Sequence, residues 1–369
     1  MTKAIGFLNL HDDLDLGPLT TNRSIASTSF LGRYALMDFQ MSNFSNSGID
    51  EIGVLLKQNI RSLVRHMGFG HSWIDNTKIG KVSIMYDEPY ANNLAYHDIN
   101  NFIENKWVLE QSSADIVVIA PAHIINKIDY RPIIERHLER DSRITMLYTG
   151  VIDARSNYIG NDFLTIDANG HVKSIKPNNG EEKEGLLSLQ TYIFNREMLE
   201  SLIQYGSNTS SFFNLRDALA YICKDIAIDT YEFNGFMRSF DSLSSYLSHS
   251  LELLNPKVRN QLFSKDWPIY TKTYDTAPTV YGPDSNVKNS FISNGAMIEG
   301  EVVNSVIGRG VKVSKGAKIS NSVILTETFI DENICIDKSV VDKNAKIIHT
   351  KKVSGTFENP LYIKRGDII

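Results

Sequence analysis

The segment Ile307-Gly308-Arg309-Gly310-Val311-Lys312-Val313-Ser314-Lys315-Gly316-Ala317 decides the fold of the C-terminal part of this 369-residue chain. Branched aliphatic residues recur at six-residue steps, with small or turn-forming residues between them. The spacing continues on both sides, at Ile292 and Ile298; Ile307, Val313, Ile319 and Leu325; Ile330 and Ile336; Val341 and Ile347. Hexapeptide periodicity predicts a parallel β-helix in which each coil stacks on its neighbour. The alternative, a run of short antiparallel strands, does not explain so long a repeat. Slips of phase between the groups predict short corner loops.

Up to about residue 255 the pattern is different, because short apolar strands alternate with amphipathic helices. Expected strands cover residues 4–8, 51–56, 115–120 and 143–148, and expected helices cover 36–47 and 130–140. The near-continuous apolar run 115–120 is typical of a strand that is buried on both faces of a parallel sheet. This alternation predicts an open α/β domain, in which ligands bind beyond the carboxyl ends of the strands. We therefore expect an α/β domain over 1–255, a linker over 256–283 and a β-helix over 284–369.

Composition and charge exclude several classes of protein. The net charge is −5 and neither Lys nor Arg forms a run, so we expect no binding to nucleic acid or to an anionic membrane. No apolar run approaches the roughly 20 residues of a membrane-spanning helix, and the N-terminus reads as a strand rather than a signal peptide. Cys223 and Cys335 lack metal-ligand spacing and are expected to be reduced thiols. We predict a cytoplasmic protein.

Five blocks, in this order, make the chain resemble the glucose-1-phosphate adenylyltransferases, which make ADP-glucose for glycogen. They are Phe30-Leu31-Gly32-Arg33-Tyr34-Ala35-Leu36-Met37-Asp38-Phe39, Met41-Ser42-Asn43-Phe44-Ser45-Asn46-Ser47-Gly48-Ile49, His123-Ile124-Ile125-Asn126-Lys127-Ile128-Asp129-Tyr130, Trp267-Pro268-Ile269-Tyr270-Thr271 and Met297-Ile298-Glu299-Gly300. The resemblance covers nearly the whole chain. It implies a Rossmann-like nucleotidyltransferase domain with a mixed, mostly parallel sheet, followed by a left-handed parallel β-helix of hexapeptide repeats.

The chain departs from this family in the loop that holds the nucleotide triphosphate. Where the family has Gly-Gly-x-Gly-x-Arg-Leu, residues 10–16 read Leu-His-Asp-Asp-Leu-Asp-Leu. Glycines let the backbone approach phosphates closely, and the bulk of Leu10 and His11 opposes this. Asp15 replaces the family arginine, and one like-charge pair at contact costs about 4 kcal/mol at an effective dielectric of 20. Ile25 stands where the family has lysine. We expect ATP binding to be strongly weakened.

The metal site departs as well. Nucleotidyl transfer needs Mg²⁺ to bridge phosphate oxygens, held by carboxylates from two separate loops. The resemblance places one of these carboxylates at Ala122 and the other at Ser239. Alanine cannot bind a metal, and serine is a weak neutral ligand. Asp241, two residues further on, is an alternative second ligand, but the first has no substitute. We therefore predict no catalytic residue and no metal site in this chain.

The remaining site positions match the family pattern in part. Lys176 and Ser188 fit the sugar-phosphate block of the family, although Gln190 stands where that block has glycine. A vestigial sugar-phosphate site is one interpretation, and a solvated Lys176 is the other. Arg33 fills the basic place where the family senses phosphorylated effectors. It is the effector candidate, the alternative being an exposed structural arginine.

The sequence therefore favours a regulatory, catalytically inactive subunit of a glucose-1-phosphate adenylyltransferase. We expect it to bind no cofactor itself, and to act in a hetero-oligomer, by resemblance a tetramer, with a catalytic homologue that uses Mg²⁺ and ATP. A sugar phosphate is the expected effector. Two alternatives stay open: an active nucleotidyltransferase with atypical ligands, and a stand-alone sensor of sugar phosphates.

Overall fold

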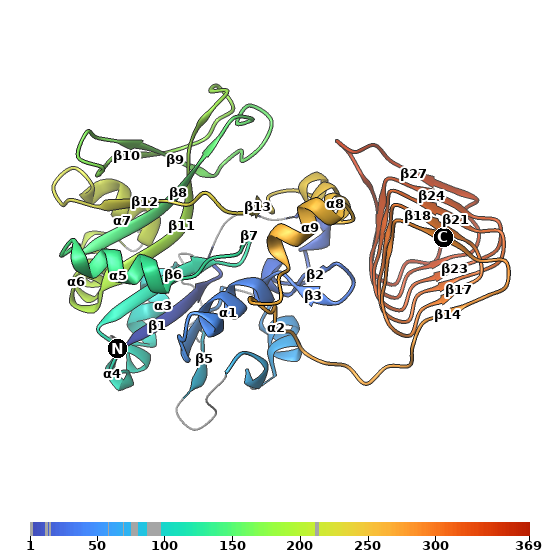
Figure 1. Cartoon of the computed structure of the whole chain (residues 1–369), viewed down its shortest axis with the longest axis horizontal. Coiled ribbons are helices and arrows are strands. Elements are labelled where there is room, and N and C mark those ends of the chain that lie inside the picture. Colours follow the sequence, from blue (N-terminus) through green and yellow to red (C-terminus); the bar gives the residue numbers. More distant parts are fainter. Residues whose placement is uncertain are drawn as a thin grey trace. The chain divides into compact units, whose positions relative to one another are not determined.

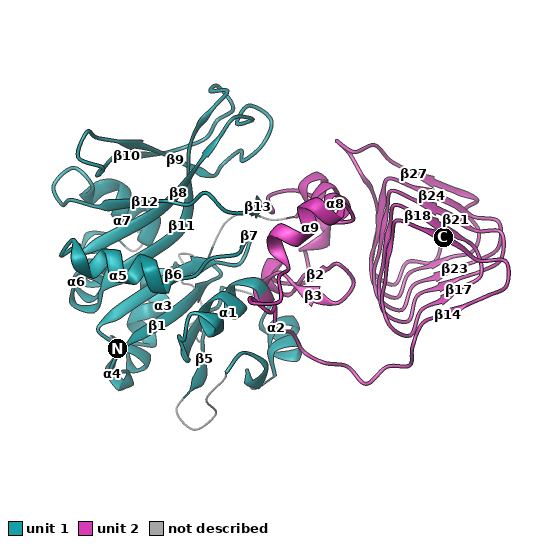
Figure 2. Cartoon of the chain, viewed as in Figure 1, with its two compact units in different colours: residues 1–14, 39–239 teal, residues 15–38, 240–369 magenta. Residues whose placement is uncertain are grey.

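The computed structural model describes residues 3–11, 14, 16–57, 59–68, 70–74, 80–86, 97–210 and 214–369. The chain divides into two compact units (Figure 2). Unit 1 comprises residues 1–14 and 39–239, and unit 2 comprises residues 15–38 and 240–369. The units therefore divide the chain at points other than the expected boundaries at 255 and 283. The reason is that residues 15–38 and 240–283 group with the β-helix rather than with the α/β sheet.

Unit 1 is built on a nine-stranded mixed sheet in the order β10-β9-β11-β6-β1-β4-β5, with β8 paired to β11 and β12 paired to β8 (Figure 1). Its strands are β1 (Ala4–Asn9), β4 (Glu51–Leu55), β5 (Lys81–Met85), β6 (Ile116–Pro121), β8 (Ile144–Val151), β9 (Asp162–Ile166), β10 (Val172–Pro177), β11 (Gly185–Asn195) and β12 (Asp229–Glu232). All of them except β10 and β11 run in one direction. The mixed, mostly parallel sheet is confirmed.

The helices of unit 1 include those that periodicity predicted, α1 (Met37–Asn46) and α5 (Arg131–Glu139). The others are α2 (Ile60–Met67), α3 (Asp98–Glu104), α4 (Trp107–Gln111), α6 (Arg196–Thr209) and α7 (Leu215–Ile222). Every residue of β6 is buried, as its apolar run indicates. Phe7 of β1 meets Phe102 of α3 edge to face, with ring centroids 5.0 Å apart. Such aromatic pairs add to the area that the core buries.

Two of the sequence blocks form a buried polar network that fixes the chain after β6. The Asn43 side chain on α1 donates to the Asn126 side chain (2.8 Å) and carbonyl (3.2 Å). The Tyr130 hydroxyl donates to the Gln40 carboxamide (3.0 Å), and the Tyr130 backbone N–H donates to the Ser47 hydroxyl (2.9 Å). Buried polar groups are stabilising only when they are hydrogen-bonded. These blocks therefore position the scaffold around the expected active site.

Unit 2 contains a left-handed parallel β-helix made of three five-stranded parallel sheets (Figure 1). The first sheet is β14 (Val280–Tyr281), β17 (Met297–Ile298), β20 (Lys312–Val313), β23 (Phe329–Ile330) and β26 (Lys346–Ile347). The second is β15 (Asn286–Lys288), β18 (Glu301–Val303), β21 (Lys318–Ser320), β24 (Cys335–Asp337) and β27 (Lys352–Ser354). The third is β16 (Phe291–Ile292), β19 (Val306–Ile307), β22 (Val323–Ile324), β25 (Ser339–Val341) and β28 (Leu361–Ile363).

The step between coils explains the slips of phase in the sequence. Val306 pairs with Val323 and Val323 with Val340, a step of 17 residues, while Phe291 pairs with Val306, a step of 15; both are shorter than the 18 residues of three hexapeptides. One corner is therefore shorter than the other two. At one corner the residues with positive φ stack from coil to coil; they are Asn289, Asn304, Asn321 and Lys338. Asparagine tolerates this left-handed conformation better than other side chains.

The rest of unit 2 consists of short elements, and one of its connecting segments carries a buried ion pair. Its elements are the 3-10 helices η1 (Gly17–Leu19) and η2 (Ile25–Ser27), the hairpin β2 (Ser29–Phe30) and β3 (Tyr34–Ala35), α8 (Leu243–Glu252) and α9 (Pro256–Leu262). The Arg23 guanidinium pairs with the Asp342 carboxylate in the last coils of the β-helix, and both side chains are more than nine-tenths buried. The Tyr362 hydroxyl donates to the same carboxylate (2.7 Å). This pair fastens residues 15–38 to the β-helix.

No helix in the described ranges combines the length and apolar character that crossing a membrane requires. The cytoplasmic location stays a prediction. Cys223 and Cys335 are both free, the first buried and the second exposed.

Candidate functional site

The loop after β1 holds packed side chains where the family has glycines. The Leu10 backbone N–H donates to the Leu55 carbonyl (3.1 Å), and the Leu10 side chain is buried. The His11 ring is 9% exposed, and its Nε2 lies 3.3 Å from the Asn101 side-chain nitrogen. Asp15, which replaces the family arginine, lies outside the described residues, as do Asp12 and Asp13. Ile25, in the place of the family lysine, lies half-buried in η2.

The two places of the expected metal carboxylates lie at the same end of one strand pair in unit 1. Ala122 links β6 to β7 (Ile124–Asn126), and β7 pairs antiparallel with β13 (Met237–Ser239), where Ser239 is opposite Ile124. Ala122 and Ser239 are each 1% exposed, and the Ser239 hydroxyl lies 3.4 Å from the Asn161 carboxamide oxygen. The fold thus sets a methyl group and a neutral hydroxyl where Mg²⁺ would need carboxylates. These residues do not fit a magnesium ion.

The alternative ligand Asp241 lies in unit 2, just before α8. Its carboxylate accepts a hydrogen bond from the Ser242 hydroxyl (3.2 Å), and Ser242 caps α8 through the Ser245 backbone N–H. Within the described ranges, no three His, Cys, Asp or Glu side chains form a group that could hold a metal ion.

A cavity of about 220 Å³ opens at the carboxyl ends of β1 and β6, where α/β sheets bind their ligands. Its lining in the described part of unit 1 consists of Asn9, His11, Leu14, Asp98, Pro121, Gly160, Gln190, Tyr192, Asn214, Leu215 and Arg216. Neither Lys176 nor Ser188 is among these residues. Lys176 is exposed on β10, and the buried Ser188 hydroxyl accepts the backbone N–H of Gln190 (3.1 Å). The structure therefore does not bring Lys176 and Ser188 together in this cavity.

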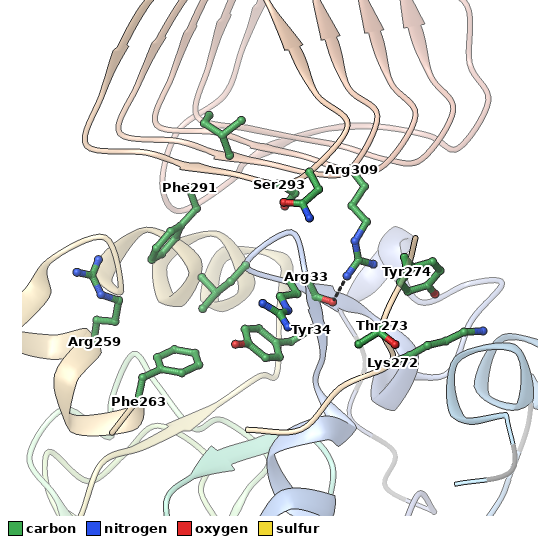
Figure 3. A pocket seen from close by; sticks show the side chains of 13 residues that line it. Arg33, Tyr34, Arg259, Phe263, Lys272, Thr273, Tyr274, Phe291, Ser293 and Arg309 are labelled. Atoms are coloured by element: carbon green, nitrogen blue, oxygen red, sulfur yellow. Dashed lines mark hydrogen bonds between the residues drawn. The ribbon is translucent and has the colours of Figure 1, made fainter. Parts of the chain in front are cut away.

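Arg33 lines a second cavity, of about 530 Å³, that lies entirely within unit 2 (Figure 3). Four of the lining side chains are cationic and four are aromatic, and no carboxylate is among the described lining residues. The cations are Arg33, Arg259, Lys272 and Arg309, and the aromatic residues are Tyr34, Phe263, Tyr274 and Phe291. Sequence reasoning found only Arg33, because these positions are far apart in the chain and no spacing connects them.

The hairpin between β2 and β3 positions Arg33 at this cavity. Gly32 has a φ of +70°, and a Cβ added to it would lie 2.2 Å from the Ser293 hydroxyl, so only glycine fits this close approach. Arg309 reaches the hairpin from the β-helix and donates to the Arg33 carbonyl (3.3 Å; Figure 3). Its guanidinium also lies 4.1 Å from the centroid of the Tyr274 ring.

The electrostatics of the second cavity favour an anionic ligand. Burial lowers the pKa of Arg309 most; the positive charge of Arg33 lowers it further, against the opposing effects of Tyr274 and Asp38. Arg33 and Arg309 are thus like charges held near one another. An anion between them would relieve this repulsion, and arginine binds phosphate groups in a bidentate geometry.

Comparison with known proteins agrees with this architecture. Residues 15–241 match the nucleotidyl transferase family. The chain belongs to that family. Residues 278–358 match the GlmU-like, C-terminal hexapeptide family. The chain is 30% identical to the glycogen biosynthesis protein GlgD of Bacillus subtilis (strain 168), over 95% of its own length and 92% of that protein.

Similarity also extends to several proteins named glucose-1-phosphate adenylyltransferase. The one from Acetivibrio thermocellus is 28% identical over 90% of this chain and 79% of its own length. The one from Thermosipho melanesiensis is 31% identical over 82% of this chain and 74% of its own length. The chain is thus a member of the glycogen-related nucleotidyl transferases, and the resemblance seen in its sequence blocks is confirmed.

Proposed function

We propose that this chain is a regulatory, non-catalytic subunit of a glucose-1-phosphate adenylyltransferase. Its partner would be a catalytic homologue that converts ATP and glucose 1-phosphate into ADP-glucose and pyrophosphate. The observation that carries this proposal is the pair of buried residues Ala122 and Ser239, which stand at the expected metal places, Ala122 between β6 and β7 and Ser239 at the end of β13.

The residues that the family uses for catalysis are replaced in more than one part of the expected site. Metal-assisted transfer needs both carboxylates to hold an ion that stabilises the charge of the transition state. Here the metal places are neutral, and the side chains of Leu10 and His11, at the start of the loop after β1, are buried. A single divergent position could be replaced by a neighbour, whereas two separate losses favour an inactive site. Meanwhile the buried network around Asn43 and Tyr130 keeps the scaffold ordered.

An inactive subunit can still regulate an active one. If this chain binds one conformation of its partner more tightly, it shifts the partner toward that conformation. Coupling free energies of about 1–3 kcal/mol change a partner's affinity by about 5–150-fold. The scaffold of this chain would supply the interface.

The cationic cavity of unit 2 supports a regulatory role for Arg33. Its four cations and its lack of a described carboxylate suit a phosphorylated ligand. Its volume of about 530 Å³ lies within the roughly 300–1,000 Å³ typical of small-molecule sites. We take a sugar phosphate as the effector and Arg33 with Arg309 as the residues that bind its phosphate.

Replacing Arg309 with alanine should weaken the binding of glucose 6-phosphate about tenfold or more, because a hydrogen bond to a charged group contributes roughly 1.5–3 kcal/mol. Titration calorimetry of the full chain measures this. Arg365→Ala, which removes an exposed arginine outside the cavity, is the matched control and should leave the affinity unchanged. If Arg309→Ala binds glucose 6-phosphate as tightly as the parent chain, this cavity is not the effector site.

Co-expression with the catalytic homologue of the same organism tests the partner. We expect the two chains to co-purify and to elute together on size exclusion as a hetero-oligomer. If the chain remains alone but binds sugar phosphates, it is a stand-alone sensor. If the isolated chain makes ADP-glucose with Mg²⁺, it is an active enzyme with atypical ligands. Either result contradicts the proposal.

A further inference from the structure

Two tyrosine rings from neighbouring helices lie stacked on the surface of unit 1. Tyr205 belongs to α6 and Tyr221 to α7, and their ring centroids are 6.2 Å apart with an interplanar angle of 28°. The two residues are 38% and 58% exposed. The buried faces of both helices belong to one hydrophobic core, which fixes the backbone beneath the rings. Tyr205 and Tyr221 therefore form an exposed and positioned pair, the tyrosine platform.

The tyrosine platform is separate from the two cavities described above. Neither tyrosine lines the cavity at the carboxyl ends of β1 and β6 or the cationic cavity of unit 2. Leu215 and Arg216, at the start of α7, line the first of these cavities, whereas Tyr221 lies at the other end of that helix. A ligand on the platform would therefore be held outside the expected active site.

The α6 side of the platform is polar but uncharged. Residues 201–214 contain no Lys, Arg, Asp or Glu, although 22% of the chain is charged. Gln204 and Asn208 are exposed on the same helix, and the Gln204 carboxamide donates to that of Asn208 (3.1 Å). Carboxamides can both donate hydrogen bonds to hydroxyl groups and accept them. This side of the platform therefore suits a neutral ligand that carries hydroxyl groups.

The α7 side of the platform does not favour an anion. The exposed charged residues around Tyr221 are of both signs, with Asp217 one turn before it and Lys224 and Asp225 one turn after it. A phosphate group is bound by clustered cations, which this side does not supply among its described residues. A phosphorylated sugar is therefore a poor match for the platform.

The tyrosine platform is also too small for a stable contact with a second protein. An aromatic side chain buries about 150–250 Å² when it is fully covered. The exposed parts of the two rings thus offer at most about 250 Å², far below the roughly 800 Å² that each partner contributes to a stable protein interface. A narrow polymer chain needs no more than this.

The shape of the platform narrows the polymer further. A pyranose ring has C–H groups on its faces, which pack against the negative face of an aromatic ring, and hydroxyl groups around its edge. Successive units of an α-1,4-linked glucan turn relative to one another, whereas those of a β-1,4-linked glucan form a flat ribbon. Two tyrosine rings inclined by 28° match a chain whose units turn.

We propose that the tyrosine platform is a surface site that holds this chain on an α-glucan such as glycogen. Tyr205 and Tyr221 stack against successive glucose units, and the carboxamides of Gln204 and Asn208 bind their hydroxyl groups. The choice of polymer rests on membership of the glycogen-related nucleotidyl transferases and not on the regulatory role.

Titration calorimetry of the purified full chain with maltoheptaose and with cellohexaose tests the proposal. We expect saturable binding of maltoheptaose and weaker binding of cellohexaose. Tyr221→Ala should lower the affinity for maltoheptaose about fivefold, because a stacked ring contact changes an equilibrium constant by about 2–10-fold. Tyr221→Phe keeps the ring and should bind close to the parent chain. Co-sedimentation with glycogen should show the same order.

The control variant is Trp107→Ala, which removes an exposed aromatic side chain from α4 of the same unit and should leave maltoheptaose binding unchanged. Because Tyr221 is largely exposed, its variants should melt at the temperature of the parent chain. The proposal is overturned if maltoheptaose does not bind, if cellohexaose binds as tightly, or if Tyr221→Ala binds as well as the parent. A change of oligomeric state in Tyr221→Ala on size exclusion would also overturn it, since the platform would then join copies of the chain. None of these measurements needs the catalytic partner, so their outcome is independent of the regulatory role.

Discussion

Replacing Ala122 and Ser239 together with aspartate should destabilise the metal-free protein by about 3–5 kcal/mol, the usual cost of uncompensated buried charge. Both places are 1% exposed, so the two carboxylates would be desolvated; Ala122 lies two residues before Ile124, the residue that pairs with Ser239. Mn²⁺ should reverse part of the loss, because a ligand that binds only the native state at 100 times its Kd contributes about 2.7 kcal/mol. Urea unfolding with and without Mn²⁺ measures both effects.

The double substitution Ala122→Asn with Ser239→Asn is the control for this experiment. It changes the size of both side chains but adds no charge, so its stability should not depend on Mn²⁺. We expect no ADP-glucose from the aspartate variant either, because Leu10 and His11 still stand where the family has glycines. Stability of the aspartate variant that is independent of Mn²⁺ would show that the two places do not form one site.

Replacing Asp342 with alanine should destabilise unit 2 by about 3–5 kcal/mol, since it leaves the Arg23 guanidinium buried without its counter-ion. The Tyr362 hydroxyl loses its acceptor in the same step. Chemical denaturation followed by circular dichroism measures the change. Glu332→Ala, which removes an exposed carboxylate from the β-helix, should stay within about 0.5 kcal/mol of the parent.

A second variant distinguishes the ion pair from simple packing. Replacing both partners, Arg23→Met with Asp342→Leu, should recover much of the stability, because apolar residues of similar volume often replace a buried pair without loss. A double variant as unstable as Asp342→Ala would show that the pair contributes through its geometry and not through the unpaired charge.

Periodicity made the secondary structure predictable. The six-residue step predicted the β-helix, and its slips of phase predicted the short corners that the 17-residue coil contains. The apolar run 115–120 became the fully buried β6. Such patterns survive in a sequence because every repeat must bury the same face.

The sites were less predictable, because they depend on distant residues meeting in space. Arg33 was predicted because it lies in a sequence block that resembles the family. Arg259 and Arg309 line the same cavity, but only the folded structure shows this. The presence of Gln190 in place of the family glycine could be read from the sequence, but its positive φ could not. Lys176 was matched by its neighbouring proline, yet it lies on an exposed strand away from the cavity.

The most direct test of the regulatory role is the steady-state kinetics of the catalytic homologue with and without this chain, using ATP, glucose 1-phosphate and Mg²⁺. We predict no ADP-glucose from this chain alone, and a change of at least about fivefold in the kcat or KM of the homologue when the two are assembled. ADP-glucose formation by the isolated chain, or kinetics of the homologue that its addition leaves unchanged, would contradict the account.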